Sequence, residues 1–157
     1  MKLKFIFALI AVTILSSCAS IPKETVDLSN VLGNDLKVLH NSHKTMVELY
    51  YNEIIDDINV FIDDVYSPFV IHYVLKTELQ KYKKQEQSIY GTIEEAGKIG
   101  GKKETDNALS IMTEFVKDAN TQIEKKRNEL LHPIIKQKNS ILRNINDSYG
   151  NTIYANS

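Results

Sequence analysis

The histidines are the residues in this chain best suited to bind a metal. They stand at positions 40, 43, 72 and 132. A catalytic zinc site takes three protein ligands, and beside His72 and His132 only Glu129 could supply the third. His40 and His43 are three positions apart, but the polar stretch 40–43 is expected to interrupt the helix that would align them. We therefore expect no metal site, with the histidines as ordinary polar side chains.

Paired carboxylates, which could serve in acid/base catalysis, occur as adjacent doublets. The doublets are Asp56 with Asp57, Asp63 with Asp64, and Glu94 with Glu95. Adjacent residues of a helix point about 100° apart, so a doublet does not converge on one substrate. The glycines of "GKIGGKK", residues 97–103, follow a helical pattern and lack the GK[ST] ending of a phosphate-binding loop. With no GxSxG motif for a nucleophilic serine, the sequence predicts a protein that is not an enzyme and needs no cofactor.

The single cysteine, Cys18, follows a short apolar segment at the N-terminus. Two lysines precede the run 5–15, which is apolar except for one threonine, and two serines stand directly before the cysteine. A basic start, an apolar run and small residues are typical of a secretory signal peptide. A helix that spans a bilayer needs about 20 apolar residues. The run is therefore too short for a permanent anchor.

The sequence Leu15-Ser16-Ser17-Cys18 resembles the lipobox of bacterial lipoproteins, in which a branched apolar residue and two small ones precede a cysteine. The resemblance implies removal of signal peptide 1–17, attachment of a diacylglycerol to the sulfur of Cys18, and acylation of the new amino terminus, with palmitate as the expected fatty acid. By the sorting rule of enteric bacteria, Ala19 in place of an aspartate implies the outer membrane rather than the inner. The alternative is an ordinary secretory signal, which would leave Cys18 as an exposed thiol.

The composition of the mature chain indicates its class. Removal of residues 1–17 takes away two lysines and leaves 17 basic and 20 acidic side chains, a net charge of −3. Such a charge favours no bulk attraction to nucleic acid, so we expect no nucleic-acid partner. With six glycines, three prolines and no tryptophan in the whole sequence, the chain is expected to form long helices with little loop.

Apolar spacing divides the chain into helical segments. Residues 18–25 are expected to form a tether and 26–40 a first helix, while the capping-box spacing of Thr45 and Glu48 predicts a new helix from about Met46. Beyond it, apolar side chains recur at alternating steps of three and four, as in a coiled-coil seam. The expected seam positions are 54, 58, 61, 65, 68, 72, 75, 79, 82, 86, 89, 93 and 96, then 109, 112, 116, 119, 123, 126, 130, 134, 141, 145 and 149.

The glycine-rich segment 97–103 predicts a turn between two antiparallel arms. If the turn is centred between Gly100 and Gly101, residues whose numbers add to 201 lie at the same level. Pro68 then lies level with Pro133, and the aspartates at 56, 57, 63 and 64 lie near the basic residues at 136, 138 and 143. The predicted fold is all-α: a long, coiled-coil-like helical hairpin over 26–149. Segment 26–40 could pack beside it as a third helix, and 150–157 is expected to be a flexible tail.

Four residues lie at the predicted turn: Lys98, Ile99, Lys102 and Lys103. The lysines either solubilise the turn or present a positive tip to an anionic partner. The anchor, the hairpin and the lack of catalytic motifs together suggest an envelope lipoprotein that acts as a helical spacer or protein-interaction module, with the membrane and an envelope protein or a second copy as partners. The alternative is an exclusion or immunity lipoprotein, encoded by a phage, plasmid or toxin locus, that blocks an incoming molecule.

Overall fold

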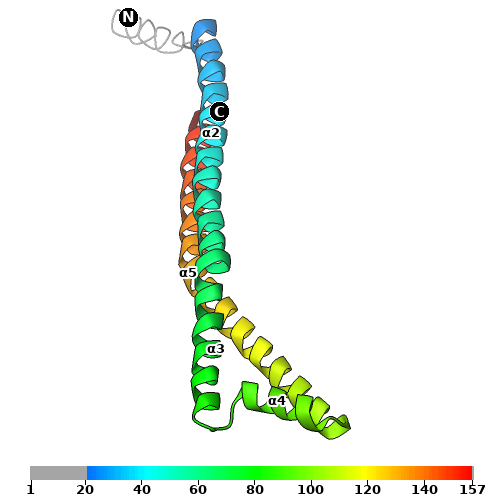
Figure 1. The fold of residues 1–157 in the computed structure, drawn as a ribbon. Helices are drawn as coiled ribbons and strands as arrows, with labels where there is room; N and C mark the ends of the chain where they lie inside the picture. The colour runs from blue at the N-terminus through cyan, green and yellow to red at the C-terminus, as the bar shows by residue number, and fades with distance from the viewer. Residues whose placement is uncertain (1–20, 157) are drawn as a thin grey trace, which may run out of the picture. The chain divides into compact units, whose positions relative to one another are not determined.

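The computed structural model describes residues 21–156, and these residues are almost entirely helical. The elements are α2 (Lys23–Phe61), a π-helical turn η1 (Ile62–Tyr66), α3 (Ser67–Lys83), α4 (Ile89–Ile99) and α5 (Lys102–Asn156), as Figure 1 shows. No strand occurs in this range, and the C-terminal helix α5 packs against the N-terminal helix α2. The prediction of an all-α helical hairpin is therefore confirmed. The expected signal peptide and Cys18 lie outside the described residues.

The described chain divides into two units. The first unit contains residues 21–43 and 145–156, and the second is Lys44–Asn144. In the first unit, the start of α2 is hydrogen-bonded to the end of α5: Ser29 Oγ donates to the carbonyl oxygen of Asn156 at 2.9 Å, and Asn156 Nδ2 donates to the carbonyl oxygen of Ser29 at 2.8 Å. A Cβ at position 33 would lie 3.2 Å from Asn156 Nδ2, so Gly33 permits this close approach. Residues 150–156, expected to form a flexible tail, are thus helical and held at their end.

Helix α2 runs unbroken through residues 40–43, where a break was expected. Two polar side chains of this stretch, His40 and His43, contact α5. Nε2 of His40 lies 2.8 Å from Oδ1 of Asn146, and the hydroxyl of Tyr149 lies 2.8 Å from Nδ1 of His43. The Tyr149 ring also stacks on His40, with 5.0 Å between the ring centroids. The prediction of a separate helix over 26–40 was wrong because this polar run forms a contact between helices rather than a loop.

In the second unit, the buried face of the first arm departs from the predicted seam after Ile58. Ile54 and Ile58 are partly buried as predicted, but the buried face then passes in steps of four through Ile62, Tyr66 and Val70. Phe61 and Val65, predicted to belong to the seam, are 44% and 55% exposed. An α-helix has 3.6 residues per turn, so residues spaced four apart gradually rotate away from one side of it. The π-helical turn contains one extra residue and keeps these residues on the buried side.

Pro68 gives a physical reason for that turn. It has no N–H group, and in a regular helix its ring would meet the carbonyl group four residues earlier. The preceding turn widens instead, so that both the N–H group and the hydroxyl of Ser67 donate to the carbonyl oxygen of Ile62, the hydroxyl at 2.7 Å. The structure places Pro68 at the start of α3, after the widened turn.

The first arm ends at Lys83, although the seam was predicted to continue to position 96. The polar residues 84–88 lie outside the helices, with Gln85 at a positive φ of 62°. Helix α4 then begins after Ser88, which is buried and whose Oγ accepts a hydrogen bond from the N–H group of Gly91 at 3.1 Å. Ser88 is thus an N-cap. The sequence-based seam ran through this boundary because Ile89, Ile93 and Ala96 continue its spacing.

The pairs of residues that lie side by side on the two arms of the second unit also differ from the predicted pairs. Arg127 donates to Asn59 Oδ1 at 2.8 Å and to Asp63 Oδ1 at 2.6 Å, and Lys138 donates to Asn52 Oδ1 at 2.7 Å. The numbers of these paired residues add to 186–190 rather than to 201, because the arms end at Lys83 and Lys102 and α4 with its flanking residues forms the connection. The predicted levels of Pro68 with Pro133, and of the aspartates with the basic residues at 136, 138 and 143, were therefore wrong.

The buried core is small. Within the described residues, the buried apolar side chains are Tyr51, Ile62, Val70, Ala108, Ala119 and Ile123. Positions 119 and 123 of α5 were predicted correctly. Before them, the partly or fully buried apolar positions are 108, 111 and 115, whereas the predicted positions 109, 112 and 116 are exposed. None of the described helices is long and apolar enough to span a bilayer.

Candidate functional site

The predicted turn is present, and it places the four predicted tip residues together. Helix α4 ends at Ile99 and α5 begins at Lys102. Gly100 and Gly101 connect them with positive φ values of 69° and 97°, which glycine adopts without strain. The Ile99 side chain is 66% exposed.

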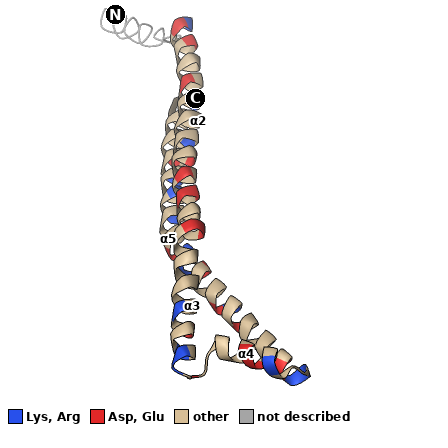
Figure 2. Ribbon diagram, in the orientation of Figure 1, with Lys and Arg blue, Asp and Glu red and all other residues tan. Residues whose placement is uncertain are grey.

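The charges of the tip are largely compensated. Lys98 forms an ion pair with Glu94, and Lys102 Nζ lies 2.6 Å from Asp106 Oδ2. Figure 2 shows both signs of charge at the corner between α4 and α5. Over residues 94–106 the three lysines stand against four carboxylates. A positive tip, one of the two sequence-based interpretations, therefore has little net charge to present.

The other sequence-based candidates do not converge. His72 is exposed on α3, and His132 lies on α5 beside Ile135 and Lys136. In residues 21–156, no three histidine, cysteine or acidic side chains gather closely enough to hold a metal ion. His40 and His43 do share a face of α2, but their contacts are with Asn146 and Tyr149.

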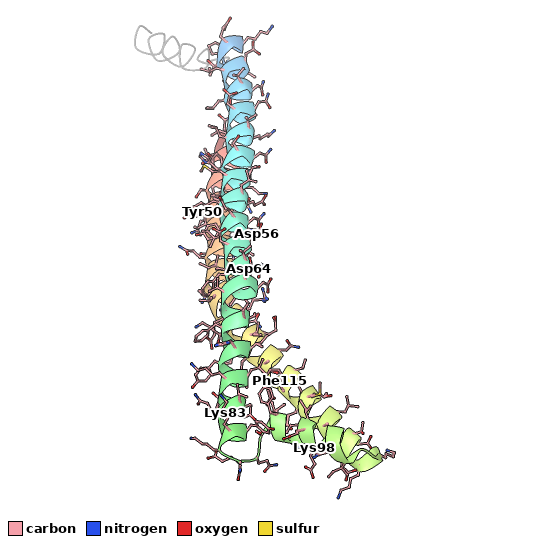
Figure 3. The ribbon with its side chains drawn as sticks, in the orientation of Figure 1. Tyr50, Asp56, Asp64, Lys83, Lys98 and Phe115 are labelled. Carbon is pink, nitrogen blue, oxygen red and sulfur yellow. The ribbon has the colours of Figure 1, made fainter. Side chains whose placement is uncertain are left out.

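A cleft in the second unit is lined by side chains of three helices. It lies between α3 and α5, with the start of α4 at one end, and has a volume of about 450 Å³. Apolar side chains form its floor: Val74 of α3, Ile89 of α4, and Ile111, Phe115 and Ala119 of α5. Figure 3 shows Phe115 on the side of α5 that faces α3. Glu78, Lys81, Gln87, Ser88, Glu114, Asp118 and Gln122 complete the lining.

The wall of this cleft at the start of α4 is fixed by Glu78. Its Oε1 accepts a hydrogen bond from Lys81 Nζ at 2.6 Å, and its Oε2 accepts one from the N–H group of Ile89 at 2.9 Å. The Lys81 ammonium group and then the Ile89 N–H group stabilise the charged carboxylate and lower the pKa of Glu78 below 4.5. Glu78 thus satisfies a free N–H group in the first turn of α4 and holds that helix to α3.

A second set of contacts lies where α4 meets α3. The Tyr82 hydroxyl donates to Oε2 of Glu94, which also pairs with Lys98. The hydrogen bond to the carboxylate raises the pKa of Tyr82, and the hydrogen bond from Lys98 lowers the pKa of Glu94. Tyr82 and Tyr90 lie 6.4 Å apart between ring centroids. The α3–α4 corner is therefore held by two separate carboxylates.

Two other carboxylates of the cleft have no such partners. Glu114 and Asp118 are exposed, four residues apart on the same face of α5, and line the cleft beside Phe115. Neither makes a hydrogen bond or an ion pair in the described structure, and the only lysine of the lining, Lys81, is bonded to Glu78. The cleft thus combines an apolar floor with a rim of excess negative charge.

Sequence reasoning did not find this cleft. It depends on the end of α3 at Lys83 and on the return of the chain through α4, whereas the spacing analysis continued one helix through both. The polar run "KKQEQS" at 83–88, followed by Gly91 three positions after Ser88, was the available signal. A serine N-cap after a polar run would have predicted a helix start at Ile89.

Comparison of the chain with protein-family models, with curated proteins and with solved structures finds no match.

Proposed function

We propose that this protein is a membrane-anchored lipoprotein of the bacterial cell envelope, held by lipid on Cys18, and that its helices serve as a non-enzymatic spacer and protein-interaction module. The proposal rests for its anchor on the lipobox-like residues 15–18 and for its interaction role on an exposed apolar surface of α3. The membrane and an envelope protein or second copy are the proposed partners.

The exposed surface that supports the interaction role is the α3 stripe. It is defined as Phe69 and Tyr73 of α3 together with Val65 of η1 and Phe61 at the end of α2. These four side chains follow one another in steps of four. Phe69 and Tyr73 are the most exposed, at 64% and 63%, and their rings stack with 6.4 Å between centroids. Aromatic side chains carry much of the binding free energy of protein interfaces, and an exposed apolar row of this kind is typical of a contact surface.

The anchor is tested by following the protein in cells. With Cys18 intact, the chain should incorporate labelled palmitate and sediment with the membrane fraction. The Cys18→Ala variant should lose the label and the membrane association, because a signal peptide without a lipobox cysteine adds no acyl chain. Label retained by Cys18→Ala, or wild-type protein found free of the membrane, would contradict the proposal.

The interaction role is tested by photo-crosslinking in living cells. A photoreactive residue at Phe69 probes the α3 stripe, and one at Ile99 probes the tip. We expect a discrete adduct from position 69 that disappears in the Cys18→Ala background, because an unanchored chain no longer meets a membrane-bound partner. A probe at exposed Leu109, outside the stripe, is the control. Equal adducts from 69 and 109 would indicate random encounter and remove the support for a dedicated surface.

A further inference from the structure

The geometry points to the cleft between α3 and α5 as a docking groove for a basic amphipathic helix of another protein or peptide. The groove has the two properties that such a helix requires, an apolar floor and an acidic rim. The inference deepens the proposed interaction role and rests on it. It names the chemistry of one partner, where the proposed function states only that partners exist.

The floor is long enough for a helix to lie in. Ile111, Phe115, Ala119 and Gln122 follow one another along three turns of α5, and this span is roughly 16 Å at 1.5 Å per residue. Val74 and Glu78 stand one turn apart on the facing side of α3. Two helices that leave an apolar groove between them accept the apolar face of a third helix, whose contacts recur at positions i, i+3, i+4 and i+7.

The apolar side chains of the groove remain accessible. Val74, Ile111 and Phe115 are only half-buried, although they face the interior of the second unit. An aromatic ring and two aliphatic side chains in this position would lose further water contact when a helix is seated. Burial of this kind contributes about 25 cal/mol per Å² of apolar surface removed from water.

The carboxylates at the edge of the groove determine which charge a bound helix should carry. Glu114 and Asp118 extend from the same face of α5 and have no cationic partner, while the third carboxylate, Glu78, is already bonded to Lys81 and to the Ile89 N–H group. The uncompensated charge of the lining is therefore negative. A helix with lysine or arginine beside its apolar face would complement it, and an acidic helix would be repelled.

The tip of a second copy of this chain is less suited to the groove than a basic partner. Lys98 and Lys102, the lysines near exposed Ile99, are already paired with Glu94 and Asp106. Basic amphipathic helices also act on membrane surfaces, where an anchored protein would meet them. Such a helix would also be compatible with the exclusion alternative, in which the protein blocks an incoming molecule.

The test uses the full lipidated chain in non-ionic micelles and an 18-residue synthetic helix with leucines at i, i+3, i+4 and i+7 and lysines elsewhere. Binding is measured by calorimetry, and the methyl resonances of Val74 and Ile111 report the location. We expect micromolar binding with shifts at these methyl groups. A peptide with glutamates in place of the lysines should bind at least tenfold more weakly.

Matched variants separate the groove from general attraction to an acidic protein. Glu114→Gln with Asp118→Asn removes two charges at the rim, and Asp56→Asn with Asp57→Asn removes two charges from exposed, unpaired aspartates of α2. Two exposed ion pairs together correspond to roughly a twofold to thirtyfold change in affinity. We expect about a tenfold loss from the first pair of substitutions and less than a twofold change from the second.

Several results would overturn the inference. Equal losses from both double variants, equal binding of the lysine and glutamate peptides, methyl shifts confined to other residues, or no binding at 1 mM peptide would each do so. Self-association abolished by the Glu114 and Asp118 substitutions would assign the groove to a second copy instead. The proposed function is judged separately, since the palmitate label and the membrane fraction depend on Cys18 and not on these carboxylates.

Discussion

At the residue scale, Glu78 shows how one side chain determines a local structure. Its carboxylate binds Lys81 and the N–H group of Ile89, and these contacts lower its pKa below 4.5. A group with a lowered folded-state pKa stabilises the protein above its unfolded pKa, and this stabilisation is lost as pH falls through the folded pKa. The connection between α3 and α4 should therefore weaken in acid.

The effect of a Glu78 substitution on the free energy of unfolding should depend on pH. At pH 7, Glu78→Gln should lower the free energy of unfolding by about 1 kcal/mol, because a neutral amide makes weaker hydrogen bonds than a carboxylate. At pH 3 the difference between wild type and variant should be smaller than at pH 7, because the stabilisation by the charged carboxylate is lost as the pH falls through the lowered folded-state pKa of Glu78. Urea unfolding at the two pH values measures both. Glu114→Gln, which removes an unpaired carboxylate, serves as the control, and an equal effect of the two substitutions at pH 7 would contradict the assignment.

At the element scale, sequence periodicity gave the class of the elements and missed their interruptions. The hairpin, the turn at Gly100 and Gly101, and the α5 positions 119 and 123 followed from spacing and from glycine chemistry. The π-helical turn could not be deduced from Pro68 alone, because a helix can accommodate a proline either by a kink or by widening the preceding turn. Position 40 was misassigned because a histidine that contacts another helix has the same polarity as one in a loop.

The cleft between α3 and α5 could not be predicted from apolar spacing either. Whether Phe115 or Val116 faces α3 depends on the level and rotation of two arms, and a stripe of mixed apolar residues allows both choices. In the structure, Phe115 lines the cleft and Val116 is exposed. The connection through α4 sets how α3 and α5 lie against each other. The spacing analysis had not recognised α4 as a separate helix.

The difference between the observed buried face and the predicted seam can be tested by two substitutions three positions apart. Ile62→Ala should lower the free energy of unfolding by about 3 kcal/mol, because a fully buried side chain is replaced by a cavity. Val65→Ala should cost less than about 0.5 kcal/mol, because Val65 lies on the exposed side of the π-helical turn. A regular coiled-coil seam through position 65 would give a large cost there, so chemical denaturation of the two variants decides between the arrangements.

The turn makes a second prediction at this scale. Gly100 combines a φ of 69° with a ψ of −175°, a backbone conformation open essentially to glycine alone, so Gly100→Ala should cost about 1–3 kcal/mol. Gly97 lies within α4, and a Cβ there would meet nothing within 4 Å. Gly97→Ala should therefore stabilise the protein by about 0.5–1 kcal/mol through helix propensity. Thermal unfolding should shift in opposite directions for the two variants, and shifts of the same sign would contradict this description of the turn.

At the scale of the whole molecule, few apolar side chains of the described residues are buried and many large ones are exposed. Besides the α3 stripe, large apolar side chains such as Leu32, Leu39 and Met46 are exposed along α2. Helical proteins with few buried residues gain stability when such faces are covered by another chain. The anchor would supply the condition for this, since confinement to a membrane raises the local concentration of each copy and of its partners.

In the absence of a partner, the full chain is expected to self-associate through the α3 stripe. Burial of one aromatic side chain contributes about 1.5–3 kcal/mol, so Phe69→Ser with Tyr73→Ser should weaken the association at least tenfold. Leu109→Ser with Met112→Ser, which changes two exposed apolar residues of α5, is the matched control and should leave the association within twofold. Sedimentation equilibrium between 5 and 200 μM measures the three proteins. A wild-type chain that is strictly monomeric at 200 μM would contradict self-association and leave the stripe to a different envelope protein.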